Sequence, residues 1–218
     1  MQFLEPHDAP YTYLAWSIDL RTTGPFVRKS TTRDGARASL LEIANDLRKH
    51  EDVEVVRVLE TTFVPPMKGI PQYDLVLLVR AQGDYRPRIL ERTNDAGLPE
   101  PSLAATVNNA GLFGDTDAFD GPFMLNHFAG TTDPNAAVDA WKSVSRWYMD
   151  KLDVDNSTLL RFGAGEDWII VNYARIPAPV PMFLIGQLFR PSFYRNVRAQ
   201  LSEVGMDAFP IFTRRVSA

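Results

Sequence analysis

The order in which strand-like and helix-like segments follow one another constrains the fold of this chain more than any other feature. Strands are expected where apolar and polar residues alternate, and helices where apolar residues recur at spacings of three and four. Each half of the chain then reads strand, helix, strand, strand, helix, strand. The second half repeats the first at a spacing of roughly 110 residues, in the pattern of elements and not in residue identity.

The first half is expected to hold four strands and two helices. Leu14, Trp16 and Ile18 share one face of the first strand, as period-two alternation requires. A continuous apolar run over residues 75–79 is typical of a buried strand. The expected strands cover residues 11–20, 53–64, 73–81 and 102–108, and the expected helices cover residues 35–50 and 84–94.

The second half follows the same order. Asp133 and Pro134 supply an N-cap and a proline in the first helical turn. Trp141 and Tyr148 lie in one apolar stripe of the helix that follows, and Gly205 is expected to end the last helix. The expected strands cover residues 123–129, 157–162, 168–176 and 209–216, and the expected helices cover residues 134–152 and 193–204.

A turn-rich segment over residues 108–117 separates the halves, because its Asn, Gly and Asp residues favour turns over sheet ladders. The expected domains are residues 1–110 and 120–218. A four-stranded antiparallel sheet that is covered by helices on one face must bury its other face as well. We therefore expect an α+β protein of two ferredoxin-like repeats packed sheet to sheet, with room for a cavity between the sheets.

Several segments of the second half resemble the antibiotic biosynthesis monooxygenase domain of the dimeric α+β barrel superfamily. The segments that carry the resemblance are Leu125-Asn126-His127-Phe128, residues 136–141, residues 169–175 and Phe209-Pro210-Ile211-Phe212. Residues 73–81 of the first half are similar to the corresponding strand in small ligand-binding domains of the leucine-responsive regulators. The resemblance implies an intramolecular version of the dimeric α+β barrel, formed by two tandem units in one chain.

The same resemblance implies several functions. Similar proteins include cofactor-independent monooxygenases that act on polycyclic phenols, haem-degrading enzymes, and proteins with no established activity. The monooxygenase pattern places an asparagine on the third strand and a tryptophan four residues later. Asn172 matches the asparagine, whereas Ile176 stands where the tryptophan would be.

Three residues are the candidates for catalysis. Asn126 shares a strand face with Met124 and Phe128, so His127 must point to the opposite face. An asparagine that faces the cavity could hydrogen-bond a substrate phenol, a carbonyl or bound oxygen, and Asn172 is a candidate for the same reason. His127 could act as an acid or base, or as a haem ligand. The alternative for each is a structural role in which the side chain is satisfied by its neighbours.

Candidates for substrate binding lie on the third strand of the second half or just before it. Arg175 ends a largely apolar strand, where its guanidinium could meet a carboxylate or phenolate, although it could equally reach solvent. Tyr173 and Trp168 could line an aromatic pocket, and core packing is the alternative. No His, Asp and Glu grouping has metal-site spacing, so no metal is expected.

Composition narrows the possible partners. The net charge of −4, with basic residues spread along the chain, argues against nucleic acid. The absence of cysteine fits a reducing cytoplasm, and neither a signal peptide nor a transmembrane segment is expected.

Residues 177–191 are rich in proline and apolar residues and are expected to form a loop rather than a strand. Such a loop could lid the cavity, mediate a homodimer, touch a membrane surface or pack over the sheet edge.

The resemblance, together with these candidate residues, implies a small-molecule enzyme of the barrel type, such as a cofactor-independent monooxygenase or isomerase. Its substrate would be an apolar aromatic or polyketide-like compound held between the sheets. Two alternatives remain, a non-catalytic ligand-binding or assembly module and a haem-binding or haem-degrading protein. The haem alternative requires His127 to face the cavity.

Overall fold

The structure, a computed structural model, describes residues 2–216 of the chain and shows a mixed α+β protein. Its described residues form two compact units. The N-terminal unit comprises residues 7–108 and 213–216, and the C-terminal unit comprises residues 2–6 and 109–212. Strands β6 (Leu103–Phe113) and β10 (Met206–Val216) each divide their residues between these units.

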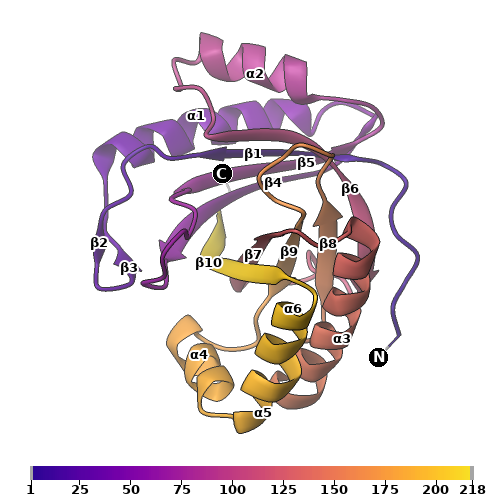
Figure 1. Cartoon of the computed structure of the whole chain (residues 1–218). Coiled ribbons are helices and arrows are strands. Elements are labelled where there is room, and N and C mark those ends of the chain that lie inside the picture. Colours follow the sequence, from indigo (N-terminus) through magenta and orange to yellow (C-terminus); the bar gives the residue numbers. More distant parts are fainter. Residues whose placement is uncertain (1, 217–218) are drawn as a thin grey trace. The chain divides into compact units, whose positions relative to one another are not determined.

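The N-terminal unit contains one sheet and two helices. The hydrogen-bonded strand order is β6, β1, β5, β4, β3, β2, and β10 pairs additionally with β4. In Figure 1, α1 and α2 lie on the same side of this sheet, and α2 contacts α1. Besides β6 and β10, its elements are β1 (Tyr11–Trp16), β2 (Thr22–Thr23), β3 (Phe26–Val27), α1 (Thr31–Leu47), β4 (Val53–Phe63), β5 (Leu75–Ala81) and α2 (Arg86–Asp95).

The core of the N-terminal unit forms where α1 packs on the sheet. Leu14 and Trp16 of β1 are fully buried together with Leu40 and Leu47 of α1. The helix brings its apolar residues to one face because they recur at helical spacing, as the sequence predicts. α1 begins four residues earlier than expected, because the Ser30 hydroxyl accepts a hydrogen bond from the backbone N–H of Arg33.

β1 ends at Trp16, whereas the sequence analysis extended this strand to residue 20. The backbone N–H groups of Ile18 and Asp19 donate to the Asp74 carboxylate at 2.9 and 2.7 Å. The Asp74 side chain thus replaces the backbone of a neighbouring strand as the acceptor, and the sheet hydrogen bonds of β1 end here. Burial raises the pKa of Asp74, although these two backbone donors oppose the shift.

The C-terminal unit also contains one sheet with helices on one face. Its strand order is β10, β7, β9, β8, β6, and the pairs β7 with β9 and β8 with β9 are antiparallel. Figure 1 shows α3 and α6 side by side, with α4 at the same end of the unit. Besides β6 and β10, its elements are β7 (Pro122–Gly130), α3 (Pro134–Leu152), β8 (Ser157–Arg161), β9 (Ile170–Arg175), α4 (Val180–Leu188), α5 (Pro191–Phe193), the π-helical turn η1 (Tyr194–Arg198) and α6 (Ala199–Glu203).

The ends of the C-terminal unit's helices follow the sequence signals. Asp133 caps α3, because its carboxylate accepts from the backbone N–H groups of Asn135 and Ala136 at 2.8 and 3.3 Å. Asp153 ends α3 in the left-handed conformation, with φ of 53°. Gly205 follows α6 with φ of 68°, as expected of a glycine after a helix.

The turn-rich linker expected over residues 108–117 is wrong for its first part, which belongs to β6. The side chain of Asn109 donates to the backbone oxygens of Leu159 and Gly111, at 2.9 and 3.0 Å, and so holds the strand instead of a turn. Gly111 lies against the ring of Trp141, where a Cβ atom would come within 2.7 Å of the indole. Glycine therefore serves close packing here rather than a turn.

The loop expected over residues 177–191 is also wrong, because residues 180–188 form α4. Pro179 occupies the cap position and Pro181 the first turn, where a missing N–H group costs nothing. Val180 and Phe183 are buried, and Phe183 packs edge to face on Phe212 at 6.4 Å. Prolines that exclude a strand are thus compatible with the start of a helix.

The N-terminal unit runs strand, helix, strand, strand, helix, strand when the short strands β2 and β3 are set aside. The C-terminal unit runs strand, helix, strand, strand, and then has four helical segments, α4, α5, η1 and α6, before its last strand. The tandem ferredoxin-like repeat and its sheet-to-sheet packing stay predictions, as does the division into residues 1–110 and 120–218. The coarser expectation of an antiparallel α+β fold is confirmed.

Candidate functional site

Asn126 of β7 and Asn172 of β9 lie directly opposite each other in the antiparallel register. Residues paired in this way project from the same face of a sheet. That face also carries Met124 and Ala174, and it is the face on which α3 packs. The two asparagine candidates therefore share the helix-covered face of the C-terminal unit.

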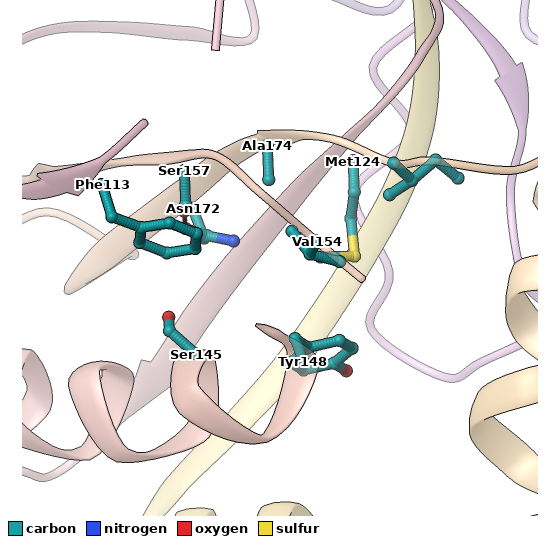
Figure 2. Close-up of a pocket in the computed structure, with 9 residues that line it drawn as sticks. Phe113, Met124, Ser145, Tyr148, Val154, Ser157, Asn172 and Ala174 are labelled. Carbon is teal, nitrogen blue, oxygen red and sulfur yellow. Dashed lines mark hydrogen bonds between the residues drawn. The ribbon is translucent and has the colours of Figure 1, made fainter. Parts of the chain in front are cut away.

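The side-chain oxygen of Asn172 is held by two donors. It accepts from Nε1 of Trp141 at 2.7 Å and from Oγ of Ser157. Only an oxygen can accept both bonds, so they fix which end of the amide is which. The amide nitrogen has no acceptor among residues 2–216. Figure 2 shows this nitrogen pointing toward Val154 and Met124.

A small pocket opens at this amide group. Its cavity volume is about 20 Å³, which is enough for one water-sized group. Figure 2 shows Ser145 and Tyr148 projecting from α3 toward the strands that form the other wall. The pocket is lined by Phe113, Met124, Ser145, Tyr148, Val154, Ser157, Asn172, Ala174 and Ile176. Asn172 thus presents a fixed N–H donor to a mostly apolar space.

Tyr148 closes the pocket on the helical side. Its hydroxyl donates to Oε1 of Gln187 at 3.0 Å, and its ring stacks on Phe183 with centroids 6.1 Å apart. Burial raises the pKa of the Tyr148 phenol, so the hydroxyl stays protonated at neutral pH. Tyr148 therefore tethers α3 to α4 and is a hydrogen-bond donor, not a base.

Asn126 carries an unsatisfied acceptor. Its Oδ1 atom is buried and has no hydrogen-bond partner among the described residues. Buried amide oxygens are normally paired, so this one is available to a donor that enters from outside the chain. Asn126 does not line the pocket, although it lies across the strand pair from Asn172.

His127 lies on the opposite face of β7, with no exposed surface. Its ring packs at 5.1 Å from that of Trp168, which in turn packs at 5.6 Å from Phe209. Burial lowers the pKa of His127 to about 3, although hydrogen bonds with the backbone of Phe209 and Leu125 oppose the shift. The imidazole is therefore neutral at physiological pH, and this geometry does not favour a role as a general acid or base.

The buried position of His127 also decides whether this residue could be a haem ligand. An axial histidine needs a free ring nitrogen that faces a cavity of porphyrin size. His127 is enclosed by aromatic rings and backbone, and the pocket at Asn172 has a volume of only about 20 Å³. These residues do not fit haem as they stand. Residues 2–216 also contain no cluster of three or more His, Asp or Glu side chains arranged to hold a metal ion.

The predicted substrate-binding residues are engaged with neighbours instead of the pocket. Arg175 forms two bonds with the Asp155 carboxylate, at 2.8 and 3.0 Å, and its guanidinium lies 5.4 Å from the Phe119 ring. The Tyr173 hydroxyl donates to Asp117 at 3.1 Å. Trp168 packs between the rings of His127 and Phe209. Their roles in binding stay predictions, and the structure brings none of them to the pocket.

Three residues that line the pocket, Ser145, Tyr148 and Ser157, were not among the site residues predicted from sequence. Neither was Trp141, which does not line the pocket but holds the side-chain oxygen of Asn172. Trp141 and Tyr148 were assigned to the helix stripe that packs on a sheet, which is where they lie. One feature of the sequence could have identified this group of residues. Ser157 and Asn172 occupy inward positions of paired strands, and they face a helix stripe that contains the indole N–H of a tryptophan.

No protein-family model and no curated protein matches this sequence. Solved structures do match over nearly the whole chain. An anthrone oxidase-like protein superposes with a TM-score of 0.59, 10% identity, and coverage of 99% of this chain and 94% of the other. A candidate monooxygenase from Lactobacillus acidophilus superposes with a TM-score of 0.54 and 11% identity, over 95% and 94% of the two chains.

A haem-binding protein from Thermus thermophilus is also similar, with a TM-score of 0.51, 9% identity, and coverage of 99% and 93%. Sequence identities near one in ten carry no information on individual residues. The comparisons therefore show that the chain shares the mixed α+β fold of these proteins over nearly its full length.

Among residues 2–216, no helix has the length and apolar character needed to cross a bilayer.

Proposed function

We propose that this chain is a small-molecule oxygenase that binds the enolate or phenolate oxygen of an apolar aromatic substrate at Asn172. The observation that carries the proposal is the oriented amide. Trp141 and Ser157 hold Oδ1 of Asn172, so its N–H donor is fixed toward an apolar pocket. A fixed donor in a site of low polarity stabilises developing negative charge on oxygen better than water does.

The proposed reaction converts an activated methylene group to a carbonyl. The substrate loses a C–H proton to solvent water and becomes an enolate whose oxygen accepts from Asn172. The carbanion carbon gives its electron pair to dioxygen, forming a C–O bond and, after protonation, a hydroperoxide. Loss of water then leaves the carbonyl, so that CH₂ and O₂ become C=O and H₂O. No carboxylate or imidazole lines the pocket, so the acidity of the substrate itself supports the first step.

Admission of an aromatic ring requires the pocket to widen. The volume of about 20 Å³ holds only the substrate oxygen. The hydrogen bond from Tyr148 to Gln187 and the stack of Tyr148 on Phe183 join α3 to α4 at this point. We propose that these contacts open when the ring enters.

Anthrone is a suitable probe, because it has an activated methylene and the fold is that of an anthrone oxidase-like protein. Oxygen uptake and anthraquinone formation would be measured above the uncatalysed rate. Asn172→Leu is expected to lower the catalysed rate by about a hundredfold, the usual cost of losing one such donor. Asn94→Ala, an exposed asparagine of α2, is the matched control and should leave the rate unchanged.

A non-catalytic binding module is the second candidate, and the small volume of the pocket favours it. Ligand pockets commonly enclose about 300 to 1,000 Å³. Thermal stabilisation by anthrone without oxygen uptake would support the module and would argue against the oxygenase. A Soret shift on addition of haem would argue against both.

A further inference from the structure

The outer face of α4 is apolar and exposed. Met182, Ile185, Leu188 and Phe189 recur at spacings of three, three and one, which places them on one side of the helix. Their exposed fractions are 63%, 52%, 46% and 82%. The inner face is apolar as well, with Val180 and Phe183 buried. A helix that is apolar on all sides is normally buried, so the exposed side needs a covering surface.

The chain around α4 is strongly basic, although the whole protein is acidic. No Asp or Glu lies between Asp167 and Glu203, whereas four arginines do. Arg190, Arg195 and Arg198 are exposed, and none forms an ion pair with a carboxylate among residues 2–216. Nε of Arg190 donates to the backbone oxygen of Gly186 at 2.9 Å, which keeps that positive charge at the end of α4.

Tyr194 follows α4 by a few residues and supplies an exposed amphipathic aromatic group, since its side chain is 45% exposed and its ring packs on Phe193. Figure 1 shows α4 and α5 at the same end of the C-terminal unit, joined by a short connection. We name the exposed set Met182, Ile185, Leu188, Phe189, Arg190, Tyr194, Arg195 and Arg198 the α4 surface.

Two kinds of partner could cover an apolar and basic surface, a second copy of the chain or an anionic bilayer. A two-fold dimer would place the α4 surface against itself. The arginines of both copies would then meet with no carboxylate in the segment to neutralise them. An anionic lipid surface supplies both an apolar interior and negative head groups, so it matches the α4 surface in both respects.

We propose that the α4 surface binds the C-terminal unit to the surface of anionic lipid bilayers. The nine residues of α4 span about 13 Å, which is less than half of a bilayer core. The helix would therefore lie in the interface, with Ile185 and Phe189 among the acyl chains and Arg195 and Arg198 at the phosphates. This inference does not depend on the proposed reaction.

The test measures flotation of the whole protein with vesicles of phosphatidylcholine, with and without about 30 mol% phosphatidylglycerol. Binding is expected only to the anionic vesicles, and it should weaken from about 0.1 M to about 0.5 M NaCl. Arg195→Gln with Arg198→Gln should lower the partition coefficient about thirtyfold, because each arginine near such a surface contributes about 1 kcal/mol. Ile185→Ser with Phe189→Ser should lower it about tenfold or more.

Matched controls come from the N-terminal unit. Lys29→Gln with Lys68→Gln removes the same charge, and Met67→Ser removes a side chain that is 43% exposed. Neither variant should change the partition coefficient, and circular dichroism should show that every variant is folded. Absence of binding to anionic vesicles, or equal losses in the control variants, would overturn the proposal. So would a dimer, detected by light scattering, that Phe189→Ser converts to a monomer.

Discussion

The indole N–H of Trp141 donates to the side-chain oxygen of Asn172 across 2.7 Å, joining α3 to the central strand β9 of its sheet. Trp141→Phe removes this donor and leaves Ser157 as the remaining partner of that oxygen. The free energy of unfolding should fall by about 1 to 2 kcal/mol, as for other buried hydrogen bonds that lose one partner. Urea denaturation would measure this change.

The matched control for that variant is Trp147→Phe on the same helix. Trp147 donates to Ser192 at 3.2 Å and does not line the pocket. Both variants should lose stability, whereas only Trp141→Phe should weaken anthrone binding. Equal effects of the two variants on anthrone binding would show that Trp141 does not orient Asn172.

Gly111 gives a second test of the same packing. A Cβ atom at this position would lie 2.7 Å from the Trp141 ring, closer than side-chain atoms approach each other. Gly111→Ala should therefore lower the free energy of unfolding by about 1 to 3 kcal/mol through overpacking. Gly35→Ala is the control, because a Cβ there meets no atom within 4 Å and α1 should gain about 0.5 to 1 kcal/mol. A neutral Gly111→Ala variant would contradict the close approach.

Glu60 forms ion pairs with three arginines in the N-terminal unit. Its carboxylate lies 3.1 Å from Arg33, 3.0 Å from Arg37 and 2.7 Å from Arg214. Burial alone would raise the pKa of Glu60, but the hydrogen bonds and charges of Arg214 and Arg37 outweigh it and lower the pKa. Glu60→Gln removes the carboxylate that the three cations share, although Asp34 still pairs with Arg37 at 2.9 Å, and it should cost about 3 to 5 kcal/mol.

The lowered pKa also fixes how this stability depends on pH. The contribution of Glu60 is complete above the pKa of an unfolded glutamate, about 4.3, and is lost as the pH falls through the lower folded value. Chemical denaturation from neutral to acidic pH would measure the loss, which Glu60→Gln should lack. Glu54→Gln is the control, because Glu54 is 38% exposed in its pair with Arg80 and should cost less than about 1 kcal/mol.

His127 should make the folded protein less stable at acidic pH, whereas a histidine paired with a carboxylate makes it more stable there. Its pKa in the folded protein is about 3, below the value of about 6.5 for an unfolded histidine. The unfolded state therefore takes up a proton first, and stability should fall as the pH drops from about 6.5 toward 3. The imidazole carbon resonances that disappear in His127→Gln should stay constant between about pH 8 and pH 4.5. Titration of these resonances near pH 6.5 would show that the ring is exposed to solvent.

Elements with strong periodicity were predictable from sequence. The stripe that contains Trp141 and the cap at Asp133 predicted α3 and its first turn, because helix spacing and capping are local properties. β6 and α4 were not predictable in this way. Asn109 and Gly111 look like turn residues until their partners Leu159 and Trp141 are known, and these lie at least 30 residues away in sequence. The prolines around α4 exclude a strand but permit a helix start.

The candidate site was predictable only in part. Alternation correctly placed Asn126 and His127 on opposite faces of β7, because period two is a property of any strand. Which face would meet α3 depends on packing that no single strand encodes. The orientation of the Asn172 amide depends on Ser157 and Trp141, which lie 15 and 31 residues away. Such geometry follows from tertiary structure and not from a local motif.

The division of β10 between the two units has a consequence for biosynthesis. The N-terminal unit includes residues 213–216, and Arg214 completes the ion pairs of Glu60. A ribosome that has produced residues 7–108 has therefore not yet supplied all the strands of that unit. Glu60 meets Arg214 only after more than a hundred further residues have been synthesised. The half that is translated first therefore cannot reach its final state before the other half has emerged.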